Sequence, residues 1–149
     1  MIGRLTFLGI LLLLVAAKVA AQSNIRNVDF KNFTYNLSCG SADTVSPVRV
    51  QQGEFSGIKR GEPVYLKILK VAYGDINSDQ KEEAVVLYMC GSGASYAYFW
   101  GLVYGVKKGK PVLLTTIAGG NKSDGGFYGV SIKRKLLIVQ RYRTGVGGS

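Results

Sequence analysis

The sequence predicts an antiparallel all-β domain, either a sandwich or an open barrel, with about seven or eight strands. Apolar or alternating runs of about 6–12 residues are separated by short turns rich in Gly, Pro and Asn. Helical periodicity is absent after residue 22. Without its first 21 residues the chain has 149 − 21 = 128 residues, which is enough for a single domain with a hydrophobic core.

The first 21 residues have the features of a cleaved secretory signal peptide. Arg4 gives a basic start, Leu5 to Ala17 is a largely apolar run of 13 residues, and small residues end at Ala21 before Gln22. A membrane span needs about 20 apolar residues, although an uncleaved anchor remains the alternative. We therefore expect a secreted or periplasmic domain over residues 22–149, with no membrane span after cleavage.

The strand candidates follow one another with turn signals between them. In order they are residues 32–37, 48–55 with a break at Gly53, 64–73, 84–90, 95–106, 111–117, 127–132 and 136–142. Residues 84–90 are apolar on both faces, which predicts a central strand covered on both sides. Residues 58–63 are a predicted turn region, and the Gly-rich segment 118–126 is a predicted loop. The chain stops soon after the last candidate, so a complete domain and one lacking a final strand both remain open.

An acidic loop lies between two of these strands. Oxygen-bearing side chains stand at every second position in Asp75, Asn77 and Asp79, Glu83 follows four residues later, and Lys81 offers its backbone carbonyl. Calcium takes 6–8 oxygen ligands, and alternating carboxylates in a tight loop supply them. The sequence thus predicts a hairpin loop that holds Ca²⁺. The alternative is a metal-free turn in which Asx side chains accept hydrogen bonds from backbone N–H groups.

The acidic loop departs from the EF-hand pattern. Gln80 and Val86 stand where an EF-hand needs Gly and Glu. The loop resembles the D-x-[DN]-x-D loop of FG-GAP and VCBS-type β repeats, in which a ligand at the ninth position, here Glu83, closes the site. With the Gly-rich loop 119–126, residues 64–140 resemble secreted bacterial proteins of unknown function. The resemblance implies a calcium-holding loop but no activity, and a single copy does not imply a propeller.

The two cysteines, Cys39 and Cys90, predict one disulfide if the chain is exported into an oxidising compartment. The alternative is a pair of buried thiols, since Cys also behaves as a small apolar residue. Neither belongs to a C-x-x-C pair, which argues against a redox-active dithiol or a Cys-rich zinc site.

One face of the strand candidate 95–106 is aromatic. It carries Tyr96, Tyr98, Trp100 and Tyr104 at alternating positions. Such rings offer flat apolar surfaces with polar edges, so they are candidates for a ligand platform that stacks on sugars. The alternative is that they fill the core.

The chain is basic, with a formal net charge of +10, or 17 − 9 = +8 once the two cations of residues 1–21 are removed. Lysines gather in the predicted turns 107–110 and 133–135. These lysines would attract an anionic envelope or glycan. The alternative is that they belong to ordinary solvated turns and discourage aggregation between strands. No nucleic-acid-binding motif is found, so nucleic acid is not an expected partner.

Catalysis finds little support in the sequence. Histidine is absent, which excludes Ser-His-Asp and Cys-His catalysis and histidine-bound zinc. A glycoside hydrolase would pair Asp124 with a carboxylate of the acidic loop, whereas Asp124 also suits the start of a Gly-Gly turn. We expect a binding or envelope-associated protein, with an envelope glycan or an extracytoplasmic protein as partner. A purely structural envelope protein is the alternative.

Overall fold

The computed structural model describes residues 24–39, 45–59, 61–92, 96–121 and 123–143. These residues form nine strands in three antiparallel sheets that do not close into a barrel, with two short 3₁₀ turns and no α-helix. The all-β prediction is confirmed, with nine strands instead of seven or eight. The elements are η1 (Ile25–Asn27), η2 (Phe30–Asn32), β1 (Thr34–Leu37), β2 (Ser46–Arg49), β3 (Glu54–Lys59), β4 (Glu62–Gly74), β5 (Glu83–Ser92), β6 (Tyr96–Lys107), β7 (Lys110–Asn121), β8 (Phe127–Lys133) and β9 (Leu136–Arg141).

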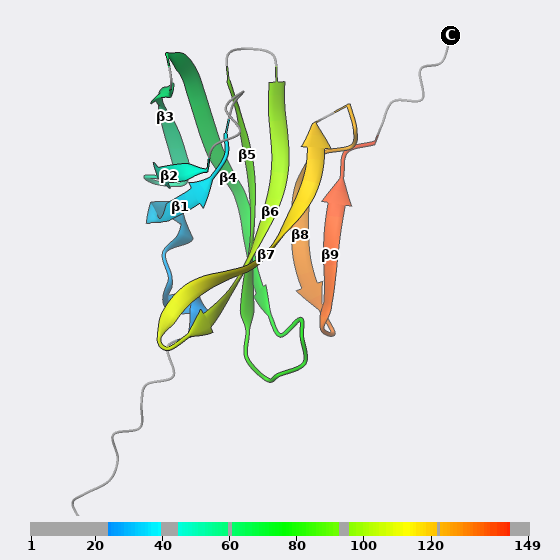
Figure 1. The fold of residues 1–149 in the computed structure, drawn as a ribbon. Coiled ribbons are helices and arrows are strands. Elements are labelled where there is room, and N and C mark those ends of the chain that lie inside the picture. Colours follow the sequence, from blue (N-terminus) through cyan, green and yellow to red (C-terminus); the bar gives the residue numbers. More distant parts are fainter. Residues whose placement is uncertain (1–23, 40–44, 60, 93–95, 122, 144–149) are drawn as a thin grey trace, which may run out of the picture.

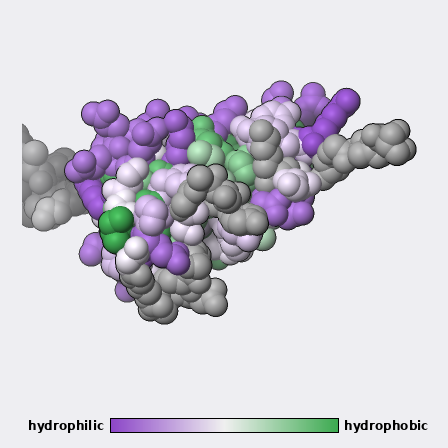
Figure 2. Space-filling model, turned by 90° about the horizontal axis from the view of Figure 1, so that it is seen from above, coloured by the Kyte–Doolittle hydropathy of each residue, from purple (hydrophilic) through white to green (hydrophobic). Residues whose placement is uncertain are grey.

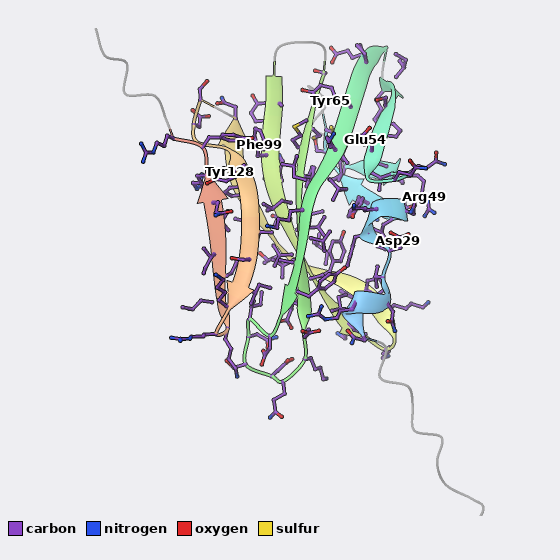
Figure 3. All side chains as sticks on the ribbon, turned by 180° about the vertical axis from the view of Figure 1, so that it is seen from behind. Asp29, Arg49, Glu54, Tyr65, Phe99 and Tyr128 are labelled. Atoms are coloured by element: carbon purple, nitrogen blue, oxygen red, sulfur yellow. The ribbon has the colours of Figure 1, made fainter. Side chains whose placement is uncertain are left out.

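The three sheets stack as layers around a central sheet of order β3-β4-β5-β6-β7. The β1-β2 pair and the two 3₁₀ turns lie on one side of it, and the β8-β9 pair lies on the other (Figure 1). One apolar cluster includes Tyr35 and Leu66 and fills the first interface. A second includes Phe99 and Phe127 and fills the other, with Phe99 visible beside the β8-β9 layer in Figure 3.

The strand β5 is covered on both faces, as its sequence predicted. Ala84 and Val86 belong to the cluster under β1-β2, while Val85 and Leu87 belong to the cluster under β8-β9. All four are 0% exposed. Because successive side chains of a strand point to opposite faces, an unbroken apolar run is what a strand buried between two layers requires.

Two segments predicted as a turn and a loop contribute residues to strands. The turn region 58–63 contains the end of β3 and the start of β4, with Lys59 paired to Glu62. Residues 118–121 continue β7. Gly119 is needed there for close packing, because a Cβ on it would lie 2.7 Å from Cδ2 of Phe127. Glycine therefore marks a tight contact in this strand and not a loop. The predicted break at Gly53 is confirmed, with a φ of 87° in the turn before β3.

The acidic loop, residues 75–82, closes the β4-β5 hairpin, since Gly74 pairs with Glu83. It lies at the lower end of the molecule in Figure 1, together with the β6-β7 and β8-β9 turns, whereas the β7-β8 connection lies at the upper end. Seen from that upper end, the described surface is mainly hydrophilic with apolar residues between (Figure 2).

The predicted signal peptide and the C-terminal residues 144–149 fall outside the described part of the chain. Within the part that is described, no helix is long and apolar enough to cross a membrane.

Candidate functional site

The acidic loop is curled by two left-handed residues. Ser78 has a φ of 68° and Gln80 a φ of 67°, a conformation that costs a residue other than glycine about 1–2 kcal/mol. The carboxylate of Asp75 stabilises the curl, since its Oδ1 accepts a hydrogen bond from the Ser78 N–H at 2.7 Å. Its Oδ2 accepts one from the Gln80 N–H at 3.2 Å. Asp75 thus anchors the first half of the loop.

The next two predicted ligands repeat this pattern. Oδ1 of Asn77 accepts from the Asp79 N–H at 2.9 Å, and Oδ1 of Asp79 accepts from the Lys81 N–H at 2.8 Å. These are Asx turns, in which a side chain replaces a backbone acceptor. The alternation that suggested metal ligands therefore also makes a chain of side-chain-to-backbone bonds.

The buried carboxylate of Glu83 accepts hydrogen bonds from two residues of the acidic loop. Its side chain is buried, with the residue only 3% exposed, and its two oxygens accept from the Ile76 N–H at 2.9 Å and from Nδ2 of Asn77 at 3.1 Å. Burial raises the pKa of this carboxyl, and the like charges of Asp79 and Asp75 raise it further, against the opposing effect of the Ile76 N–H. Glu83 is a buried acid held beside other carboxylates.

Two cations from other layers reach the loop. Nζ of Lys135, in the β8-β9 turn, lies 3.4 Å from Oδ2 of Asp75. Nε of Arg26, in η1, lies 2.5 Å from Oε2 of Glu82. The hydrogen bond from Arg26 lowers the pKa of Glu82, an effect larger than the opposing one of burial. The acidic loop thus connects the two outer layers at this end of the molecule.

The donor types fit a hard cation, but the observed arrangement satisfies the loop without one. Among the described residues, no three acidic or cysteine side chains gather closely enough to hold a metal ion. A carboxylate has about four acceptor sites, so Asp75, Asp79 and Glu83 keep lone pairs beyond the bonds given above. The geometry matches the Asx-turn alternative, and the calcium site stays a prediction.

A pocket of about 850 Å³ lies between the acidic loop and the β6-β7 hairpin. It forms because the pairing of β5 with β6 ends at Ala84 and Tyr104, while β6 runs on to Lys107. Its lining includes Ile25, Asp79, Glu83, Val106, Lys108 and Leu114. The pocket was not predicted, although the greater length of the 95–106 candidate compared with 84–90 was a signal that the hairpin projects past β5.

The pocket combines charges of both signs with an apolar wall. The loop contributes Asp79, the start of β5 contributes Glu83, and the β6-β7 hairpin contributes Lys107 and Lys108. The predicted hairpin turn is confirmed: Lys108 has a φ of 48° and Gly109 a φ of 80°, the pattern of a tight type I′ connection. Neither lysine takes part in an ion pair found among the described residues.

The described side chains of the aromatic face of β6 differ in their exposure. Tyr104 is 6% exposed and packs in the core against Phe30 and Phe33, with ring centroids 5.3 and 5.7 Å away. Trp100 is partly buried against the same cluster, and Tyr98 is 47% exposed. The side chain of Tyr96 lies outside the described part. The core interpretation holds for Tyr104, because β1 and the 3₁₀ turns cover its face of the sheet.

Asp124 does not approach the acidic loop, so these residues do not form the carboxylate pair that the glycoside hydrolase alternative would need. Its N–H donates to Oδ1 of Asn121 at 2.9 Å, and its Oδ2 accepts from the Asn121 N–H at 3.5 Å. This turn lies at the end opposite the acidic loop (Figure 1). The strand β7 separates the two ends by about 35 Å, whereas paired glycosidase carboxylates lie about 5–10 Å apart. Asp124 serves the turn.

Cys39 and Cys90 are buried neighbours without a disulfide between them in this structure. The Cys90 thiol hydrogen-bonds to Cys39 and lowers its pKa, as does the charge of Lys59, while burial acts in the opposite direction. Sγ of Cys39 also donates to the Tyr65 carbonyl at 3.4 Å. The predicted proximity of the two thiols is present, and the covalent bond stays a prediction.

No protein-family model, curated protein or solved structure matches this chain. The description of the site therefore rests on the chain's own geometry.

Proposed function

We propose that this protein is an exported, non-catalytic binding domain whose ligand occupies the pocket between the acidic loop and the β6-β7 hairpin. The observation that carries the proposal is the pocket itself. Its volume of about 850 Å³ falls in the range of ligand-binding clefts, which combine apolar walls with a few polar groups that fix orientation. The signal-like first 21 residues support export.

The charges of the pocket favour a ligand that carries both signs. Asp79 offers a carboxylate on the loop side, and Lys107 and Lys108 offer ammonium groups on the hairpin side. Val112 and Leu114, which are 37% and 54% exposed, provide apolar contact area beside them. Envelope glycans that bear charged stem peptides and extracytoplasmic proteins both have this chemistry, and an anionic envelope would also attract the basic domain.

A calcium ion bound by the acidic loop is a second part of the proposal. The specific observation behind it is the raised pKa of Glu83, which burial raises most and to which the like charges of Asp79 and Asp75 add. A divalent cation would relieve that repulsion. Asp75, Asn77, Asp79 and Glu83 would supply side-chain oxygens and Lys81 its carbonyl. The ion would supply fixed positive charge and rigidity.

The binding proposal is tested by NMR titration of the ¹⁵N-labelled domain with soluble peptidoglycan fragments, disaccharides that keep their stem peptides. Binding should shift the amide signals of the loop and of the β6-β7 hairpin, and leave those of the Asn121–Asp124 turn in place. If fragments of this kind and extracytoplasmic proteins from the same envelope leave the pocket signals unchanged, the proposal fails. The domain would then be a structural envelope component.

A further inference from the structure

The last residues of β6 form an open sheet edge inside the pocket. Pairing with β5 stops at Ala84 and Tyr104, whereas Gly105, Val106 and Lys107 pair only with β7 among the described strands. The N–H and C=O groups of a strand point alternately to its two sides. Lys107 and Lys110 flank the two-residue turn as a hydrogen-bonded pair, so Lys107 and Gly105 direct these groups to β7. Val106 directs its N–H and C=O to the place where a continuation of β5 would lie.

An apolar side chain packs closely over this stretch. Gly105 allows that packing, since a Cβ on it would lie 3.0 Å from Cδ1 of Leu114, tighter than ordinary contact. Leu114 is the extra residue of a bulge, since the register of β6 against β7 shifts between Val103 and Tyr104. The bulge places an exposed leucine at the pocket wall. The edge thus adjoins an apolar surface on which a side chain of an added strand can pack.

We infer that the ligand of this pocket is an extended peptide segment that adds as a short strand to Gly105–Lys107. Its basic side chain faces Asp79 and its acidic group faces Lys108. The inference rests on the proposed function, in which the pocket is the ligand site. Three residues of open edge correspond to about 10 Å, so a segment of three to five residues suffices.

A peptide fits this edge better than a saccharide does. Strand addition uses main-chain hydrogen bonds for affinity and pockets for alternate side chains for specificity. A peptide repeats N–H and C=O groups at the spacing of the β6 backbone, whereas sugar hydroxyl groups do not share that register. The opposite charges of Asp79 and Lys108 on the two walls also match a strand with a basic and an acidic side chain two positions apart, since such side chains share one face.

The test is an NMR titration of the ¹⁵N-labelled domain with a pool of capped pentapeptides. Lys and Glu are fixed at the second and fourth positions, and apolar residues vary elsewhere. The matched probes are the same pool N-methylated at alternate amides, in each of the two registers, and neutral chitotetraose. The parent pool should shift the amide signals of Gly105, Val106 and Lys107, and one methylated register should bind at least fivefold more weakly, since methylation removes donors from that edge.

Protein variants add an independent check. Asp79→Asn should weaken binding of the pool about two- to fivefold, less at high salt, whereas Asp124→Asn at the far end should not change it. Equal binding of both methylated registers, or shifts caused by chitotetraose and not by peptides, would overturn strand addition and leave the pocket as a ligand site. If peptides, chitotetraose and peptidoglycan fragments all leave the pocket signals unchanged, the proposed function fails as well.

Discussion

The guanidinium of Arg26 binds the carboxylate of Glu82 through two hydrogen bonds, of 2.5 Å from Nε and 2.7 Å from Nη2. The same guanidinium lies 5.0 Å from the centre of the Tyr73 ring. Bidentate pairs of this kind fix orientation as well as distance. They join η1, which lines one side of the pocket, to the acidic loop, which lines another.

Replacing Arg26 with Gln should raise the pKa of Glu82 toward its ordinary value, because the main group that lowers it is removed. The contribution of the pair to stability is present above the unfolded-state pKa of Glu82 and is lost as pH falls through the lower folded-state value. The stabilities of Arg26→Gln and the unmodified protein should therefore converge at low pH, as measured by urea unfolding. The matched control, Arg143→Gln at an exposed position after β9, should show no such convergence. The same curve for both variants would contradict the role of the pair.

Glu83 predicts a pH dependence of the opposite sign. Its folded-state pKa is raised, so its contribution to stability is fully present below the unfolded-state pKa and is lost as pH rises through the folded-state value. In Glu83→Gln, unfolding free energies measured from pH 4 to pH 8 should lose this decline. Glu54→Gln, on the exposed edge of β3, serves as control, and a slope that Glu83→Gln leaves intact would contradict the interpretation.

Calcium should raise the melting temperature if the acidic loop binds it. At one hundred times Kd the gain is about 2.7 kcal/mol, which is several degrees for a domain of this size. Asp75→Ala and Asp79→Ala should abolish the gain, and Glu54→Ala, outside the loop, should retain it. Thermal unfolding in EDTA and in millimolar calcium measures the difference. A curve indifferent to calcium in the unmodified protein would leave the loop as a set of Asx turns.

Oxidising conditions should join Cys39 to Cys90. The closed loop of about 50 residues corresponds to a stabilisation of about 4 kcal/mol in the chain-entropy model. The unreduced protein should be about 2 Da lighter than the reduced one by mass spectrometry, and reduction should lower its melting temperature. Cys39→Ser should be insensitive to reductant. Two free thiols after purification under oxidising conditions would contradict the disulfide.

The fold was readily predicted where sequence pattern and burial coincide. The apolar run Ala84 to Cys90 required cover on both faces, and the structure supplies two layers. The prediction was wrong where a glycine can indicate either a loop or a close packing contact within a strand. Gly119 indicated a loop from composition, but its role is to let β7 pass close to Phe127. Local sequence does not contain that contact, because it joins different layers.

The candidate site was predicted only in part. The residues of the acidic loop were identified because their alternation is local. The pocket was not, because it depends on how far β6 projects beyond β5, which is set by the register of Ala84 against Tyr104. The aromatic face of β6 was ambiguous for the same reason: Tyr104 is covered by residues from η2 and β1 that lie some 70 positions earlier in the chain.

The most direct measurement of the central claim compares two tryptophan variants in the NMR titration with peptidoglycan fragments and peptides. Leu114→Trp enlarges a side chain that lines the pocket, while Leu136→Trp enlarges one that is 66% exposed on β9. Both positions are exposed, so both variants should fold. Leu114→Trp should lose the shifts of the loop and hairpin signals, and Leu136→Trp should retain them with unchanged affinity. Equal binding by the two variants would show that the ligand lies elsewhere.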